Sequence, residues 1–358
     1  MLKKISILSI VMVALMGCAR TELVNTEREI TFAVGSYATA TKAASIIDVD
    51  NVTSFNTKAW LYAEGVVGSQ DFFGTDGETI TYNNTDAWEP SHPYYWPKSS
   101  NSYINFVSWY DNSDSYAPTT VSETALEWVN RTIDANDNIM FADVAWRYNN
   151  NASTYNFNGV VNGVPTLFHH ALTRVQFNLK ATTLQQDGKT YELTLQSVTL
   201  ASVYNRGTMR LTNSDLNATG TKAWTSTSNA TYLWTAIAGS NADTYSPVTT
   251  DTNITATNTA IMPLRSFMPQ ALGNDIKLTF TYTLTTRSGN SIVSSEDGIV
   301  TTVVLNTVKN SSNVEITEWL PNRKYIYNFA INPQGQDILL DPVLESDWGV
   351  TDLSATVE

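Results

Sequence analysis

Alternating apolar and polar residues recur in short runs along the chain, and they predict an all-β protein. In the clearest run, Thr173, Val175, Phe177 and Leu179 fall on one face, with polar residues between them. Similar runs predict strands at residues 55–62, 79–82, 276–284, 298–305 and 324–331, separated by turn residues. Short strands at roughly 8–12-residue spacing are typical of a sandwich or barrel.

Two irregularities refine this prediction in the second half of the chain. Leu193 and Leu195 share one face of a strand, whereas Val198 and Leu200 are apolar in the opposite register, which predicts a β-bulge. Pro342 lies in the apolar run 338–344 and cannot donate a ladder hydrogen bond, so this run is predicted to be an edge strand.

The N-terminus has the pattern of a secretory signal at residues 1–17. Lys3 and Lys4 precede an apolar run of about eleven residues, which is shorter than the roughly 20 needed to span a bilayer. Cys18 is the only cysteine, and it directly follows Gly17, so no internal disulfide can form. The sequence 15–18, LMGC, resembles the lipobox of bacterial lipoproteins, in which the cysteine is diacylated and becomes the first residue. The alternative is an ordinary signal peptide with an incidental cysteine.

A polar tether and one apolar strand follow Cys18. Residues 18–28 are polar, and Glu29 to Gly35 is predicted to be the first strand. The run from Thr39 to Ala43 then contains small residues and a single basic one, Lys42. The predicted location is the outer face of the cell, with lipid on Cys18 holding the chain to the outer membrane.

Composition agrees with a β protein and excludes one class of partner. The chain has 34 acidic and 21 basic residues, a net charge of −13, and no basic patch that would neutralise phosphates, so nucleic acid is not expected as a partner. Only 15% of residues are charged, and β-branched and aromatic residues are common. The region after the signal is long enough for two domains.

The residues needed for catalysis or metal binding do not form recognisable motifs. His169 and His170 would point to opposite faces of a strand and so could not serve one metal, and His92 lies in an aromatic loop. All three are predicted to have capping or surface roles. No enzyme activity, cofactor or metal is therefore expected.

The aromatic segment from Trp88 to Tyr110 has two interpretations. It includes Trp96 and Trp109, which could stack on sugar rings. Alternatively, these aromatic side chains fill the core of a chain with few Leu and Ile residues, and this interpretation is favoured.

Several stretches together resemble the fimbrillin family, the type V pilins of Bacteroidia and their lipoprotein relatives. The resemblance rests on their order along nearly the whole chain. The stretches are residues 30–32 and 41–43 after the lipobox, 94–97 with 104–106, 137–142, 168–177, 262–263 through 269–270, 319–327, and Trp348.

The resemblance implies two transthyretin-like β-sandwich domains in tandem, at residues 43–165 and 166–358. It also implies assembly by proteolysis and strand exchange: a protease cuts after a basic residue, removes the first strand, and a strand from a neighbouring subunit fills the groove. Here residues 18–42 would be removed, the cut would lie between Lys42 and Ala43, and the run from Ile338 to Glu358 would be the donor. The alternative is that Lys42 is an ordinary exposed lysine.

Two functions follow from this resemblance. The first is a structural or adhesive subunit of a surface fimbria, with other subunits as partners through strand exchange and host or bacterial surface ligands as further partners. The second is a permanently lipidated surface protein that anchors a fimbria or binds glycans. Retention of the first strand in the mature protein would favour the second.

Overall fold

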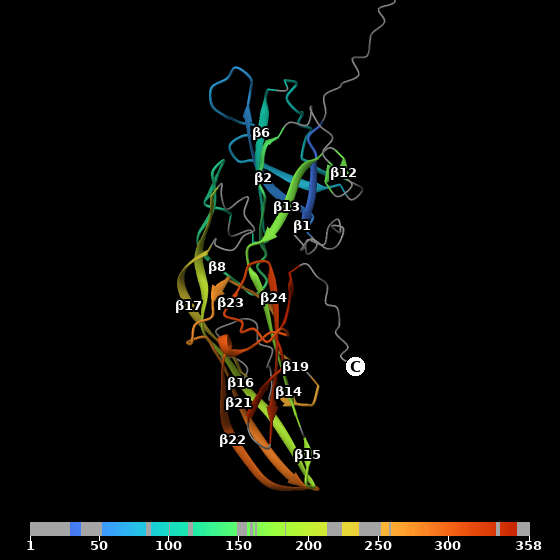
Figure 1. The fold of residues 1–358 in the computed structure, drawn as a ribbon, viewed down its shortest axis with the longest axis vertical. Helices are drawn as coiled ribbons and strands as arrows, with labels where there is room; N and C mark the ends of the chain where they lie inside the picture. Colours follow the sequence, from blue (N-terminus) through green and yellow to red (C-terminus); the bar gives the residue numbers. More distant parts are fainter. Residues whose placement is uncertain are drawn as a thin grey trace, which may run out of the picture.

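The fold is elongated and built almost entirely of β-strands (Figure 1). The computed structural model describes residues 29–36, 52–83, 87–99, 101–113, 117–148, 156–157, 160–161, 163–182, 184–212, 224–235, 252–257, 259–333 and 337–348. Within these ranges the only helix is a short 3₁₀ turn, η1 (Leu305–Thr307). No helix in the described part of the chain is both long and apolar enough to cross a membrane. The predicted all-β class is confirmed.

The N-terminal unit is a single sheet that closes on itself. Its strands are β1 (Phe32–Ser36), β2 (Ser54–Tyr62), β3 (Gln70–Asp71), β4 (Glu78–Tyr82), β5 (Trp88–Pro90), β6 (Tyr103–Asp111), β9 (Ile139–Ala142), β10 (Ala145–Tyr148) and β13 (Val164–His170). Because β6 also pairs with β2, the sheet forms a closed path through β6, β9, β13, β1, β5, β4 and β2. Apolar side chains from these strands make one core inside the path.

The C-terminal unit is a sandwich of two sheets. One contains β14 (Thr173–Ala181), β19 (Thr259–Phe267), β24 (Arg323–Asn332), β25 (Asp337–Leu340) and β26 (Leu344–Asp347). The other contains β7 (Thr120–Ser122), β8 (Ala125–Thr132), β15 (Gln185–Gln186), β16 (Lys189–Thr212), β17 (Trp224–Thr235), β18 (Thr252–Ile254), β21 (Lys277–Ser288) and β22 (Ser291–Val304). The short pairs β11 (Asn156–Phe157) with β12 (Val160–Val161), and β20 (Gln270–Ala271) with β23 (Glu318–Trp319), complete the described strands.

One long strand links the two units. β16 has 24 residues, so at about 3.3 Å per residue it spans roughly 80 Å. Its first part pairs with β21 in the sandwich, and its last part pairs with β8, which comes from the N-terminal half of the chain. A third core fills the space at this junction and includes Trp109, Trp128, Leu172 and Trp348. Therefore the two units share buried surface.

The structure agrees with the alternation predicted for the second half of the chain. β14 begins at Thr173, and its apolar side chains Val175, Phe177 and Leu179 are fully buried. The predicted bulge is present, since the register of β16 against β21 shifts between Leu195 and Ala201. β25 pairs with β24 at an edge of its sheet, as Pro342 led us to expect.

The expected division of the chain between residues 165 and 166 falls within β13. This strand pairs with β1 and β9 in the N-terminal sheet and continues to His170, and β14 begins three residues later. β7 and β8 precede that division but lie in the sheet of β16. The exact domain limits and the transthyretin-like topology of each unit stay predictions.

Candidate assembly site

The first strand lies between two strands that come from distant parts of the sequence. β1 pairs in parallel with β13, from Phe32 opposite Val164 to Ser36 opposite Phe168. On its other side it meets β5 through a single antiparallel pair, Phe32 with Trp88. Just before β1, the backbone N–H of Ile30 donates to the carbonyl of Tyr94 at 2.7 Å. As a result, β1 is paired with β13 along its whole length and with β5 at its first residue.

Three apolar side chains in and just before β1, those of Ile30, Phe32 and Val34, belong to the core of the N-terminal unit. Ile30 and Phe32 are each 1% exposed, and Val34 is also buried. The ring of Phe32 makes edge contacts with Phe55 and Phe106, at centroid distances of 5.6 and 5.7 Å. Burial of a side chain of this size contributes about 1.5–3 kcal/mol. The first strand is therefore an integral part of the sheet in this structure.

Gly163 brings the backbone of β13 directly against β1. A Cβ atom at this position would lie 2.7 Å from the nitrogen of Ala33 and 2.9 Å from the carbonyl carbon of Phe32. Real Cβ atoms do not approach backbone atoms this closely, so only glycine fits without a shift. Nothing in the local sequence marks Gly163, because its role depends on a strand that lies about 130 residues earlier.

The residues predicted for lipidation and cleavage lie outside the described residues. Cys18, Lys42 and Ala43 belong to the ranges 1–28 and 37–51, for which no structure is described. Their roles stay predictions. The described β1 lies between them in the sequence, so a cut after Lys42 would separate β1 covalently from every strand with which it pairs.

The predicted donor run, Ile338 to Glu358, begins with two short strands of its own sandwich. β25 pairs with β24 through four residues, from Phe329 opposite Leu340 to Asn332 opposite Asp337. β26 pairs with another part of β24, from Arg323 opposite Asp347 to Ile326 opposite Leu344. Residues 349–358 are not among those the structure describes.

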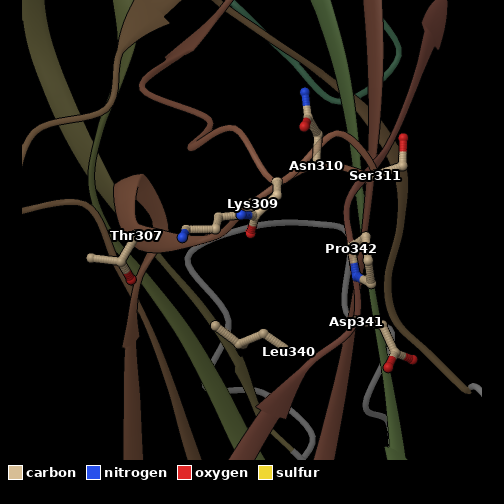
Figure 2. Close-up of a pocket in the computed structure, with 8 residues that line it drawn as sticks. Thr307, Lys309, Asn310, Ser311, Leu340, Asp341 and Pro342 are labelled. Atoms are coloured by element: carbon tan, nitrogen blue, oxygen red, sulfur yellow. The ribbon is translucent and has the colours of Figure 1, made fainter.

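Two hollows lie beside this C-terminal run. One, of about 260 Å³, is lined by residues of the loop after η1 together with Leu340, Asp341 and Pro342 (Figure 2). The other, of about 380 Å³, lies between the end of β22 and β25 and contacts Ile338 and Leu340. Figure 2 shows the Lys309 side chain extending towards Thr307 and away from Asp341. The lining of the first hollow includes the charged residues Lys309 and Asp341 as well as the apolar residues Leu340 and Pro342.

The aromatic segment is mainly core. Trp96 is 3% exposed and Trp109 is 7% exposed, and the Trp96 ring contacts Phe106 edge-on at 5.9 Å. Side chains buried to this extent cannot stack on a sugar in solvent. The favoured interpretation of core filling is confirmed for these two residues.

The adjacent histidines are buried, in contrast to the predicted capping or surface roles. His169 Nε2 lies 2.9 Å from a carboxylate oxygen of Asp143, and His170 Nδ1 lies 2.9 Å from Oδ1 of Asn138. Burial, together with the charges of Arg174 and His169, lowers the pKa of His170 from 6.5 to about 3. His92, by contrast, is exposed. The described residues contain no group of three side chains able to hold a metal ion.

A buried ion cluster at the junction was also missed by the sequence analysis. Arg131 is 1% exposed, and its Nη2 lies 3.3 Å from Asp111 and 3.1 Å from Asp137. Burial raises the pKa of Asp111 to about 6, against the opposing attraction of Arg131. Nothing in the local sequence marks Asp111 as a buried ionic residue. Its burial depends on β8, which packs beside the end of β6 only in the folded chain.

With this geometry established, comparison with known proteins identifies the family. The chain is an elongated β protein whose first strand is enclosed in a closed sheet and whose last strands lie at an edge. A family model described as fimbrillin-like matches residues 41–348, and the chain therefore belongs to the fimbrillin-like family. No protein with a curated description matches the chain.

Solved structures match about nine-tenths of the chain at low sequence identity. A fimbrial protein from Bacteroides vulgatus matches with a TM-score of 0.51 and 14% identity, over 90% of this chain and 100% of its own. A candidate cell adhesion protein from Bacteroides uniformis matches with a TM-score of 0.45 and 13% identity, over 89% of this chain and 98% of its own. At such identities only the fold is shared, and this is shown by the first structure.

Family membership supports a structural or adhesive role in a fimbria and a location at the cell surface. This agrees with the predicted resemblance.

Proposed function

We propose that this chain is a structural or adhesive fimbrial subunit that is exported as a lipoprotein on Cys18 and assembled by strand exchange. In this proposal, cleavage between Lys42 and Ala43 frees β1, and a strand from a neighbouring subunit takes its place. The observation that carries the proposal is the position of β1, which pairs with β13 over five residues, meets β5 at Phe32 and has buried apolar side chains.

The physical reason is the gap that the loss of β1 would leave. β13 would lose five paired positions, and the aromatic rings of Phe55 and Phe106 would lose their contact with Phe32. An unpaired strand edge beside an apolar groove is a template for β-augmentation, in which backbone hydrogen bonds supply affinity and alternate side chains fill pockets. An incoming strand with apolar residues at alternate positions would restore both.

The donor in this proposal is the run from Ile338 to Glu358 of a neighbouring subunit. β25 and β26 already pair with β24 of their own chain. These two strands would have to leave β24 if they are part of the donor.

The decisive experiment compares two basic residues on either side of β1. In cells that export the chain, Lys42→Gln should abolish assembled fimbriae and leave a precursor that begins at Cys18. Arg28→Gln is the matched control, because a cut after Arg28 would retain β1, and it should assemble normally. N-terminal sequencing of assembled wild-type material should begin at Ala43. Assembled material that begins at Cys18 would contradict strand removal.

The same sequencing distinguishes the alternative, a permanently lipidated anchor or glycan-binding protein. That protein would keep Cys18 and β1 in its mature form. Cys18→Ala should release it from the membrane, and labelled fatty acid should be incorporated only when Cys18 is present. If the label is absent from the wild-type protein, the lipoprotein part of both proposals fails.

A further inference from the structure

Trp348, which follows β26, contacts two side chains through its ring. It is 4% exposed. Its ring stacks on His170 with a centroid distance of 4.2 Å and an interplanar angle of 7°. The guanidinium carbon of Arg174 lies over the same ring, 4.7 Å from its centroid. His170 and Arg174 therefore both pack against the Trp348 ring, a contact that we call the clamp.

The two sides of this clamp belong to different units of the fold. His170 is the last residue of β13 in the N-terminal sheet, and Arg174 lies near the start of β14 in the sandwich. The connection between them includes Ala171 and Leu172, which are buried in the same junction core as Trp348. Trp348 therefore contacts both units at the point where the chain passes from one to the other.

Backbone hydrogen bonds of Ala171 and Leu172 cross the same junction. Ala171 N–H donates to the carbonyl of Ile139 at 2.8 Å, and Asn322 N–H donates to the carbonyl of Leu172 at 3.0 Å. Trp348 N–H in turn donates to the carbonyl of Asn322 at 3.1 Å. The amides of Ala171 and Asn322 therefore report on the state of the junction.

Most of the segment before Trp348 packs loosely. Leu339, Leu340 and Leu344 are 50%, 41% and 46% exposed, and the two hollows described above lie beside β25. Asp341 pairs with Lys180, but both side chains are partly solvated, and such pairs contribute little. Val343 and Trp348 are the buried apolar side chains of the segment 337–348. The Trp348 side chain is much larger than that of Val343.

We infer that Trp348 is a positioning residue that couples the C-terminal segment to the junction between the two units. While the ring is seated, it packs against both His170 and Arg174 and keeps the two units in register. Withdrawal of the segment from β24 removes the ring and leaves a cavity at the junction, which loosens because packed interiors tolerate voids poorly. This inference rests on the proposed function only in naming the C-terminal run as the segment that leaves.

Hydrogen exchange of the full, uncleaved chain tests the coupling. In Trp348→Ala, exchange should become at least tenfold faster at the amides of Ala171 and Asn322 as well as in β26. The matched control is Trp319→Ala, which removes an equally buried indole from the sandwich core, where its Nε1 donates to the Tyr327 hydroxyl at 2.9 Å. This control should accelerate exchange in the sandwich and leave the amide of Ala171 unchanged.

A second pair of variants keeps the test valid if Trp348→Ala does not fold. Trp348→Phe retains an aromatic ring to pack against His170 and Arg174 and should restore slow exchange at Ala171. Leu344→Pro disrupts β26 at an exposed position, and it should speed exchange at Ala171 because the strand carries Trp348. Unchanged exchange at Ala171 in both Trp348→Ala and Leu344→Pro, or equal acceleration in Trp319→Ala, would overturn the inference.

The experiment is independent of fimbrial assembly. It uses a chain that retains β1, so it requires neither cleavage at Lys42 nor a partner. Normal assembly of Lys42→Gln would refute the proposed function and leave the coupling intact. Conversely, absence of coupling would leave strand exchange at β1 untouched.

Discussion

The first and last strands of this chain are held in different ways. β1 is enclosed, with β13 on one side and β5 on the other, and its apolar side chains are buried. β25 and β26 lie along one edge of β24, and Leu339, Leu340 and Leu344 face solvent. Removal of β1 would leave β13 unpaired over five residues beside an apolar floor. Removal of β25 and β26 would mainly expose one edge.

This contrast fits the complementary roles that we propose for the two ends. An enclosed strand leaves behind a specific groove that only another strand can fill. An edge strand can leave at smaller cost, because it loses one set of ladder pairs and little apolar contact. In the C-terminal segment the main exception is Trp348, which is buried at the junction.

The largest expected effect comes from truncating the enclosed strand. In the chain that retains β1, Phe32→Ala should lower the free energy of unfolding by about 3–5 kcal/mol, because it removes a buried ring and leaves a cavity. Leu340→Ala, in the exposed edge strand, should change it by less than about 0.5 kcal/mol. Urea unfolding followed by circular dichroism measures both. Similar losses in the two variants would refute the contrast.

A smaller effect is expected from the glycine that faces β1. Gly163→Ala places a Cβ 2.7 Å from the nitrogen of Ala33, and the resulting overpacking should cost about 1–3 kcal/mol. Gly273→Ala is the matched control, since no atom lies within 4 Å of its added Cβ, and it should change stability by less than about 0.5 kcal/mol. Equal stabilities in the two variants would mean that β1 moves freely away from β13.

The clamp at the other end should respond to pH. The pKa of His170 is lowered in the folded chain, so its contribution to stability is present above about pH 6.5 and is lost as pH falls towards 3. Between pH 7 and 5 the loss should be about 2 kcal/mol. The raised pKa of Asp111 acts in the opposite direction, because its ionised form is penalised in the folded chain above about pH 4.

A variant isolates the contribution of His170 from that of Asp111. His170→Gln cannot titrate and retains Asp111, so the wild type should lose about 2 kcal/mol more than this variant between pH 7 and 5. Parallel pH profiles for the two proteins would show that His170 is not the group responsible.

The sequence was sufficient for features that depend on neighbouring residues. Alternation along 173–180 predicted β14, because one face of a half-buried strand must be apolar. The phase change near Val198 predicted the bulge in β16 for the same reason. The order of short motifs along the chain was enough to indicate the family that the comparison then established.

Other features depend on residues far apart in the chain, and only the tertiary structure determined them. The closed sheet brings β1 beside Gly163, β8 places Arg131 against Asp111, and β26 delivers Trp348 against His170 and Arg174. Nothing local marks these residues, because an isolated glycine, arginine or tryptophan gains its role from a partner that arrives by long-range strand pairing. The roles of Cys18 and Lys42 stay predictions of the sequence. A cut after Lys42 would remove β1 from the sheet, and the place of β1 in that sheet is a property of the fold.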